Sequence, residues 1–271
     1  MSRLEALRLL RHDIPILAPG EVWLAGAGPG DPGLVTLDAL AGLLQADVIV
    51  HDALVDARVL ALAHDGARLE FAGKRGGRPS VTQADISQRL IELAHAGERV
   101  LRLKGGDPYM FGRAGEETMA LAGAGVRFRV ISGVTAALAA LAASGIPATM
   151  RGINRSIIFT TGQSADARDG QDWAALARTG QPIVIYMALH NLSPIAEALM
   201  RGGLASNTPA ALIVAATRAE QGVLVSTLDR IAADAHAAGY EPPAIVVIGE
   251  IVAQRQRLQA MIDLVAAGHA P

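Results

Sequence analysis

The sequence predicts an α/β fold with a mainly parallel sheet in its first half. Short apolar strands alternate with helices at intervals of roughly 20–30 residues, which is the pattern of βαβ units. The alternation is interrupted at residues 145–152, and a second series of strands follows. We therefore expect an N-terminal arm, residues 1–18, and two domains, residues 19–148 and 149–271.

The first domain is expected to contain five strands that alternate with five helices, and residues 4–11 of the arm are expected to form a short surface helix or a frayed segment. One helix begins at a capping box, in which Thr82 and Asp85 exchange hydrogen bonds. The predicted strands are residues 21–25, 47–52, 69–72, 100–104 and 128–131. The predicted helices are residues 36–46, 54–63, 82–96, one that ends at residue 124 and an alanine-rich one that ends at residue 144.

The second domain is expected to have its own sheet, because four further apolar segments are each bounded by turn residues. Residues 166–172 are polar and are expected to form a surface loop. The predicted strands are residues 156–161, 182–187, 210–215 and 244–249, and the predicted helices are residues 173–177, 192–200, 228–238 and 251–265.

Composition excludes several classes of function. The chain has 271 residues, 51% of them hydrophobic but only 3% aromatic, so we expect a core of small aliphatic side chains. The absence of cysteine excludes disulfides, thiolate ligands and cysteine nucleophiles. A net charge of −2 argues against nucleic-acid binding, and no apolar run is long enough to cross a membrane. The histidines are scattered, so no metal is expected, and a cytoplasmic location fits best.

Two glycine-rich loops follow predicted strands and share a glycine and Asp-Pro pattern. Residues 28–33 match the dinucleotide pattern G-x-G-x-x-G, but Pro29 and Pro32 lack the N–H groups that a phosphate cradle needs. A tight turn is an equally good interpretation of this loop. Residues 105–107 repeat the pattern, and two such loops facing one cleft would suit an amino-acid moiety better than a phosphate. The alternative is that Asp107 caps a helix.

Polar residues at other strand ends suggest catalysis on an anionic substrate. Asp52 ends an apolar strand and is placed to act as a general base, although it could instead cap the following helix. The only lysines of the chain, Lys74 and Lys104, lie in or beside glycine-rich loops. A local basic cluster in a nearly neutral chain suggests a polyanionic small substrate, with ordinary surface charge as the alternative. The cluster comprises Lys74, Arg75, Arg78, Arg102, Lys104 and Arg113.

Taken together, these loops resemble the tetrapyrrole methyltransferase family. The most specific part of this resemblance is the motif Arg-Leu-Lys-Gly-Gly-Asp-Pro, residues 102–108, followed by Phe-Gly-Arg. Three positions depart from the family pattern: Ser132 replaces a proline, and Met150 and Gln163 replace histidines, so no histidine role is expected in the second domain. The matching segments are residues 22–32, 51–52, 73–76, 102–108, 111–117, 132–136, 145–147, 186–187 and 241–247.

The resemblance implies two αβα domains with a cofactor cleft between them, and a homodimer. It implies transfer of methyl groups from S-adenosyl-L-methionine to two ring carbons of uroporphyrinogen III, which gives precorrin-2 via precorrin-1, with S-adenosyl-L-homocysteine as by-product. Asp52 would accept a proton, Lys74 would donate one, and Arg102 and Arg113 would lie near the tetrapyrrole. The implied cofactor residues are Pro29, Gly105, Gly106, Asp107, Met110, Thr135, Ala136, Met187, Ala216 and Ala244.

Other functions remain open at this point. A later precorrin methyltransferase of cobalamin synthesis is the nearest alternative. An RNA ribose methyltransferase of similar fold, a nicotinamide oxidoreductase and a non-catalytic tetrapyrrole carrier are the others. The sequence does not say whether the product would be used for cobalamin or for sirohaem. Nor does it decide whether Lys104 points into a cleft or only ends its strand.

Overall fold

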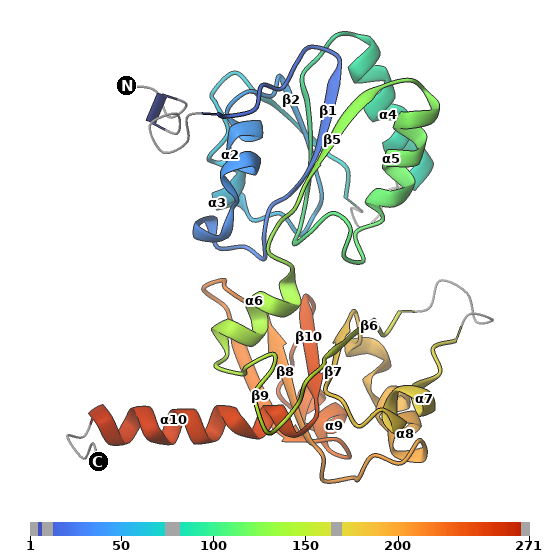
Figure 1. Ribbon diagram of the computed structural model, residues 1–271. Helices are drawn as coiled ribbons and strands as arrows, with labels where there is room; N and C mark the ends of the chain where they lie inside the picture. Colours follow the sequence, from blue (N-terminus) through green and yellow to red (C-terminus); the bar gives the residue numbers. More distant parts are fainter. Residues whose placement is uncertain (1–4, 7–12, 74–81, 164–169, 267–271) are drawn as a thin grey trace. The chain divides into compact units, whose positions relative to one another are not determined.

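The computed structural model divides into two compact units, residues 1–136 and 137–271 (Figure 1). It describes residues 5–6, 13–73, 82–163 and 170–266. Most of the predicted arm helix and most of the predicted loop at residues 166–172 lie outside these ranges. The division falls earlier than residue 148, because the alanine-rich helix α6 (Ala136–Ala143) belongs almost entirely to the second unit.

The first unit contains the predicted parallel sheet. Its strand order is β3-β2-β4-β1-β5, and each adjacent pair is parallel. The strands are β1 (Glu21–Gly26), β2 (Val48–His51), β3 (Arg68–Phe71), β4 (Val100–Lys104) and β5 (Arg127–Ile131). The helices are α2 (Leu37–Leu43), α3 (Ala57–Leu60), α4 (Gln83–His95) and α5 (Ala114–Gly123), with a 3-10 turn at Pro32–Leu34.

Helices cover both faces of this sheet, with α2 and α3 on one side and α4 and α5 on the other (Figure 1). Odd-numbered residues of β1 and β4, such as Trp23 and Leu101, pack in the same core as α2 and α3. Even-numbered residues, such as Leu24 and Val100, pack with α4 and α5. Because side chains alternate along a strand, Arg102 and Lys104 share the face of Val100. Both basic residues of β4 are therefore directed into a helix-covered layer.

Local caps explain where two of these helices begin. The predicted capping box is confirmed: the Thr82 hydroxyl accepts from the Asp85 N–H, and the Asp85 carboxylate accepts from the Thr82 N–H. That bond from the Thr82 backbone holds the pKa of Asp85 below its usual value. The helix predicted at residues 54–63 is wrong in extent. It spans only α3, because Asp56 caps it by accepting from the Arg58 N–H.

The carboxyl ends of β1, β4 and β5 come close enough to require glycine. A Cβ added to Gly26 would lie 2.4 Å from the carbonyl oxygen of Gly106, and one added to Gly133 would lie 2.2 Å from the same atom. Gly106 itself has φ +69°, a left-handed conformation that favours glycine. These three backbones pack directly against one another and hold the ends of three strands together.

We expect Gly133→Ala to destabilise the first unit by about 1–3 kcal/mol, because the methyl group would force these backbones apart. Urea unfolding monitored by fluorescence measures this difference. Gly123→Ala is the matched control, since a Cβ at that helical glycine meets nothing within 4 Å. The control should raise stability by roughly 0.5–1 kcal/mol. Equal midpoints for Gly133→Ala and wild type would contradict the expectation.

The second unit has a mixed five-stranded sheet of order β6-β7-β10-β8-β9. Strand β6 is parallel to β7, whereas β10 is antiparallel to both of its neighbours and β9 is antiparallel to β8. The strands are β6 (Ile158–Thr161), β7 (Ile183–Tyr186), β8 (Pro209–Val214), β9 (Gly222–Thr227) and β10 (Ala244–Ile248). The prediction omitted β9, an edge strand in which no residue is fully buried.

Helices also cover both faces of the second sheet (Figure 1). Helices α7, α8 and α9 share an apolar core with residues such as Ile185 and Leu212. On the opposite face, the Ala137 N–H of α6 donates to the Tyr186 hydroxyl. Besides α6, the helices of this unit are α7 (Trp173–Arg178), α8 (Leu192–Arg201), α9 (Ile231–Ala237) and α10 (Ala253–Ala266), with 3-10 turns at Leu189–Asn191 and Glu250–Val252. Within the described ranges, no helix is both long enough and apolar enough to span a bilayer.

Candidate active site

Three loops at the carboxyl edge of the first sheet are bonded into one assembly. The two predicted glycine loops pair through their backbones, since Gly28 N donates to Gly106 O at 3.2 Å and Gly106 N donates to Gly28 O at 2.8 Å. Asp107 adds the loop after β5, because its carboxylate accepts from Gly133 N at 3.0 Å and from Tyr109 N at 2.9 Å. Asp107 therefore ties loops together, and the alternative that it caps α5 is wrong.

These contacts bring together the predicted cofactor residues of the first unit. Pro29 follows Gly28, and Met110 N donates to Asp107 O at 3.3 Å. The position of a Cβ on Gly106 would lie 3.5 Å from Ala136 N and 3.7 Å from the Thr135 Cα. The set thus gathers where β1, β4 and β5 end. This is the edge at which open α/β sheets bind small ligands.

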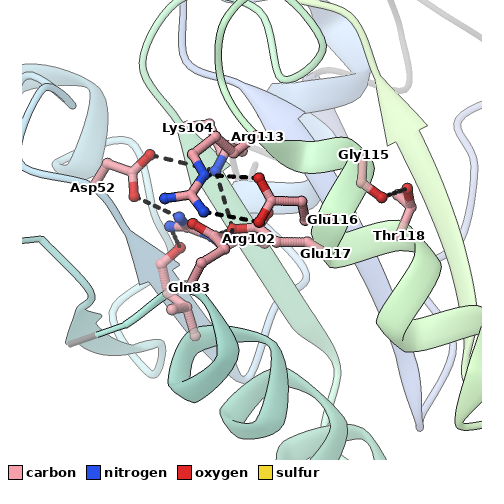
Figure 2. Close-up of polar contacts among 10 residues, drawn as sticks. Asp52, Gln83, Arg102, Lys104, Arg113, Gly115, Glu116, Glu117 and Thr118 are labelled. Carbon is pink, nitrogen blue, oxygen red and sulfur yellow. Dashed lines mark hydrogen bonds and ion pairs between the residues drawn. The ribbon is translucent and has the colours of Figure 1, made fainter. Parts of the chain in front are cut away.

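Beside these loops, the β4 cations form a charged cluster with two carboxylates (Figure 2). Arg102 Nη2 donates to Asp52 Oδ1 at 2.5 Å, and Arg102 Nε donates to Glu117 Oε1 at 3.1 Å. Lys104 Nζ lies 3.1 Å from Glu117 Oε1 and 3.7 Å from Asp52 Oδ2. Gln83 Nε2 of α4 also donates to Glu117 Oε1, at 2.8 Å. Asp52 thus does not cap a helix, and Lys104 joins an ion cluster.

Of the four charged groups of the cluster, all but Asp52 are buried. The side chains of Glu117, Arg102 and Lys104 are 0%, 1% and 4% exposed, whereas that of Asp52 is 28% exposed. Two cations face two carboxylates, so the formal charges balance, as buried charges require. Asp52 is therefore the only one of these four charged groups that a ligand can reach directly.

The second predicted substrate arginine lies in a different environment. Arg113 precedes α5 in a left-handed conformation, φ 57°, and its side chain is 60% exposed. Its Nε and Nη2 atoms donate to the two carboxylate oxygens of Glu116 at 2.8 Å. The hydrogen bond from Arg113 holds the pKa of Glu116 below its usual value, and the same bond raises the pKa of Arg113. Arg113 thus presents a fixed positive charge at the surface.

The predicted cofactor residues of the second unit also share one edge of their sheet. Met187 directly follows β7, Ala216 is the second residue after β8, and Ala244 begins β10. Because β10 runs antiparallel to both neighbours, its first residue lies opposite the last residue of β8, with Ala244 paired to Val214. Met187 is 47% exposed. The structure therefore groups these three positions within the second unit.

Backbone strain is concentrated at the same strand ends. In the described part of the chain, the non-glycine residues with positive φ all follow β4, β7 or β8. Each such residue costs on the order of 1–3 kcal/mol and persists where the surrounding structure enforces it, often at functional sites. Two of them, Arg113 and Met187, are predicted site residues, and two more flank Ala216. These residues are Phe111, Arg113, Met187, Ala215 and Thr217.

The sequence did not identify Glu117 and Gln83 as members of the charged cluster. Glu117 was included only in the matching segment 111–117, and Gln83 only in the predicted helix at residues 82–96. The sequence does indicate that Glu117 is buried, because it lies on the same face of the helix as the buried residues Ala114 and Leu121. The predicted proton donor Lys74 lies outside the described residues.

Comparisons with known proteins agree on one family. A sequence profile of the Tetrapyrrole (Corrin/Porphyrin) Methylases matches residues 21–232. A uroporphyrinogen-III C-methyltransferase of a Sinorhizobium species is 52% identical over 94% of this chain and 90% of its own length. Siroheme synthase 1 of Yersinia enterocolitica is 48% identical over 86% of this chain, but the match spans only 49% of that protein. A Thermus thermophilus uroporphyrin-III C-methyl transferase complexed with S-adenyl homocysteine shares 36% identity and a TM-score of 0.72, covering 86% of this chain and 98% of that one.

Proposed function

This chain belongs to the tetrapyrrole methylase family, and we propose that it methylates two ring carbons of uroporphyrinogen III, giving precorrin-2 via precorrin-1, with S-adenosyl-L-methionine as methyl donor. One structural observation carries the proposal. A partly exposed carboxylate, Asp52, is held by two buried cations beside the glycine loops. The similarity to a uroporphyrinogen-III C-methyltransferase over nearly the whole chain supports the choice of substrate.

Residues at the strand ends of each unit have side chains that suit parts of an S-adenosyl group. Gly105 and Gly106 have no side chain to obstruct it, and Ala216 and Ala244 leave room for a planar base. The Asp107 carboxylate uses one lone pair on each oxygen for a backbone N–H. About two further acceptor sites remain for an ammonium group. When bound, S-adenosylmethionine supplies a methyl group on a positively charged sulfur. The ten residues named above are proposed to hold it.

Asp52 is proposed as the proton acceptor. Methyl transfer to a fully substituted ring carbon gives the macrocycle one positive charge, and this charge remains until a proton leaves another atom of the macrocycle. A carboxylate stabilises such charge and can then accept the proton. Arg102 and Lys104 keep the Asp52 carboxylate in place, while its exposed side faces solvent and substrate. Lys74 is proposed as the proton donor from the family resemblance alone.

Arg113 is proposed to bind a carboxylate of the tetrapyrrole. Its guanidinium can form a bidentate pair with a carboxylate, as it does with Glu116. We expect Arg113→Ala to raise KM for uroporphyrinogen III about tenfold, as loss of a hydrogen bond to a charged group does, and to leave kcat nearly unchanged. Initial rates over a range of uroporphyrinogen III concentrations measure this change. A variant with wild-type KM would remove Arg113 from the substrate site.

The function is tested by incubating the full chain with uroporphyrinogen III and S-adenosyl-L-methionine and identifying the products by mass spectrometry. We expect precorrin-1 to appear first and precorrin-2 to accumulate. Thermal stabilisation by S-adenosyl-L-homocysteine but not by NAD is the accompanying binding test. Methylation of a later precorrin, with no reaction on uroporphyrinogen III, would refute the proposed substrate.

We further propose that the protein acts as a homodimer in the cytoplasm. Helix α10 supports self-association, because Leu258, Met261 and Ile262 are 45%, 65% and 51% exposed. Exposed apolar groups on one helix favour association with another surface. Light scattering on the purified chain should give twice the mass of the 28.1 kDa protomer. A mass of one protomer would refute the dimer.

A further inference from the structure

Glu117 stands at the centre of the charged cluster, although no substrate can touch it. Its Oε1 atom accepts from Arg102 Nε, Lys104 Nζ and Gln83 Nε2, at 3.1, 3.1 and 2.8 Å. Its side chain is 0% exposed, and among the described residues its Oε2 atom has no hydrogen-bond partner. Among the described residues, the Glu117 carboxylate therefore accepts hydrogen bonds only from the two cations and the amide around it.

Stability alone does not explain this arrangement. Glu117 occupies an inward position of α5, where Ala114 and Leu121 are buried as well. Burying a carboxylate and two cations carries a large desolvation cost, and well-packed apolar residues often serve a core equally well or better. The cluster is thus a costly way to fill the layer between β4 and the helices. A role in the chemistry at Asp52 would account for that cost.

The contacts lead from Glu117 to Asp52 through both cations. Glu117 accepts from Arg102 Nε and Asp52 accepts from Nη2, while Nη1 donates to Val50 O at 3.3 Å. Because the guanidinium is planar, these separate acceptors fix its plane and its direction. Lys104 bridges the same two carboxylates from a second position (Figure 2). Asp52 is thereby contacted by two cations, each of which is held at its other side by Glu117.

We propose that Glu117 is a positioning residue for methylation: it anchors Arg102 and Lys104 so that both face Asp52 and hold its carboxylate in one orientation. This inference rests on the proposed function, in which Asp52 accepts the proton. A misplacement of about 1 Å in a reacting group can lower a rate by roughly 100-fold. Loss of the contacts by which Glu117 fixes the orientation of the Asp52 carboxylate should therefore lower kcat measurably.

The test compares Glu117→Gln with wild type in the full chain. The amide keeps an oxygen that can accept at the Oε1 position but removes the charge. We expect kcat per S-adenosyl-L-homocysteine binding site to fall by about 10- to 100-fold. KM for uroporphyrinogen III and the Kd for S-adenosyl-L-homocysteine should stay at wild-type values. Glu98→Gln, which breaks a pair with Arg68 just before β4 begins, is the matched control and should keep wild-type kcat.

A double-mutant cycle separates positioning from general structural damage. If Glu117 acts through Asp52, Glu117→Gln should not lower the residual kcat of an Asp52→Asn enzyme any further. Damage to the fold would lower kcat in both backgrounds. Single-turnover transfer of a labelled methyl group measures these slow rates. An equal loss in both backgrounds would overturn the inference.

Glu117→Asp covers the case in which Glu117→Gln fails to fold. It keeps the charge but withdraws the carboxylate by one methylene, so we expect a smaller loss of kcat at constant KM. Wild-type kcat in whichever variant folds would overturn the inference while leaving the proposed function intact. A wild-type enzyme that makes no precorrin-2 would instead refute the proposed function, and this inference with it.

Discussion

Asp52→Asn should lower kcat for precorrin-2 formation by about 10²- to 10⁴-fold, the usual contribution of a general base. The amide keeps an oxygen that can accept from Arg102 Nη2, so the cluster retains much of its geometry. It cannot take up the proton that leaves the methylated macrocycle. S-Adenosyl-L-homocysteine should bind as it does to wild type, because Asp52 is not among the residues proposed to hold the cofactor. Steady-state kinetics and calorimetric binding give the two quantities.

Asp56→Asn is the control for this change. It makes the same substitution four residues away, and asparagine caps helices about as well as aspartate does. Asp56 begins α3 and pairs with the exposed Arg58, so its variant should keep wild-type kcat. An Asp52→Asn enzyme with wild-type turnover would remove Asp52 from the mechanism. A carrier without catalytic activity would instead show no turnover in either the wild type or the variant.

Arg102→Leu should lower the free energy of unfolding of the first unit by about 3–5 kcal/mol, because it leaves an uncompensated charge in the interior. Without Arg102, the cluster would hold two carboxylates against one lysine. The buried Glu117 cannot turn toward water to recover its hydration, since its side chain is 0% exposed. This is the largest stability effect we expect from any single change at the site.

Fluorescence can assign that loss to the first unit. The chain has two tryptophans, and Trp23 is buried in the first unit whereas Trp173 begins α7 in the second. In a Trp173→Phe background, urea unfolding followed by fluorescence therefore reports on Trp23 alone. Arg113→Leu is the control, because its exposed pair with Glu116 is worth only about 0–1 kcal/mol. Similar midpoints for the two leucine variants would contradict our description of the cluster.

The first sheet could be predicted from the sequence because its strands are short apolar runs between turns. The cluster could not, and β4 shows why. The alternation Val100, Leu101, Arg102, Leu103, Lys104 is typical of a strand with one face in water. In the structure every residue of β4 is buried, because helices cover both faces of the sheet. The balancing charge is supplied by Glu117, from a helix whose packing partner a local pattern does not specify.

In the glycine loops and the second sheet, too, local patterns could be predicted from the sequence whereas contacts between distant residues could not. The repeated glycine and Asp-Pro pattern suggested that the loops around Gly28 and Gly106 face one site, and their backbones indeed pair. The role of Asp107 depends on Gly133, which lies 26 residues later, and no local pattern reveals such a contact. Strand β9 was missed for a related reason. As an edge strand without a fully buried residue it has a weak apolar pattern, and its position depends on pairing with β8.

The order of strands in the second sheet affects how the chain folds during synthesis. In the first unit the last strand to be made, β5, lies at an edge, so the four strands made before it can already form the continuous sheet β3-β2-β4-β1. In the second unit the last strand, β10, lies between β7 and β8. Until it emerges from the ribosome, both neighbours have an open edge that can pair with other chains. A nascent chain that stalls before residue 244 is therefore an aggregation hazard, although its first unit is already complete.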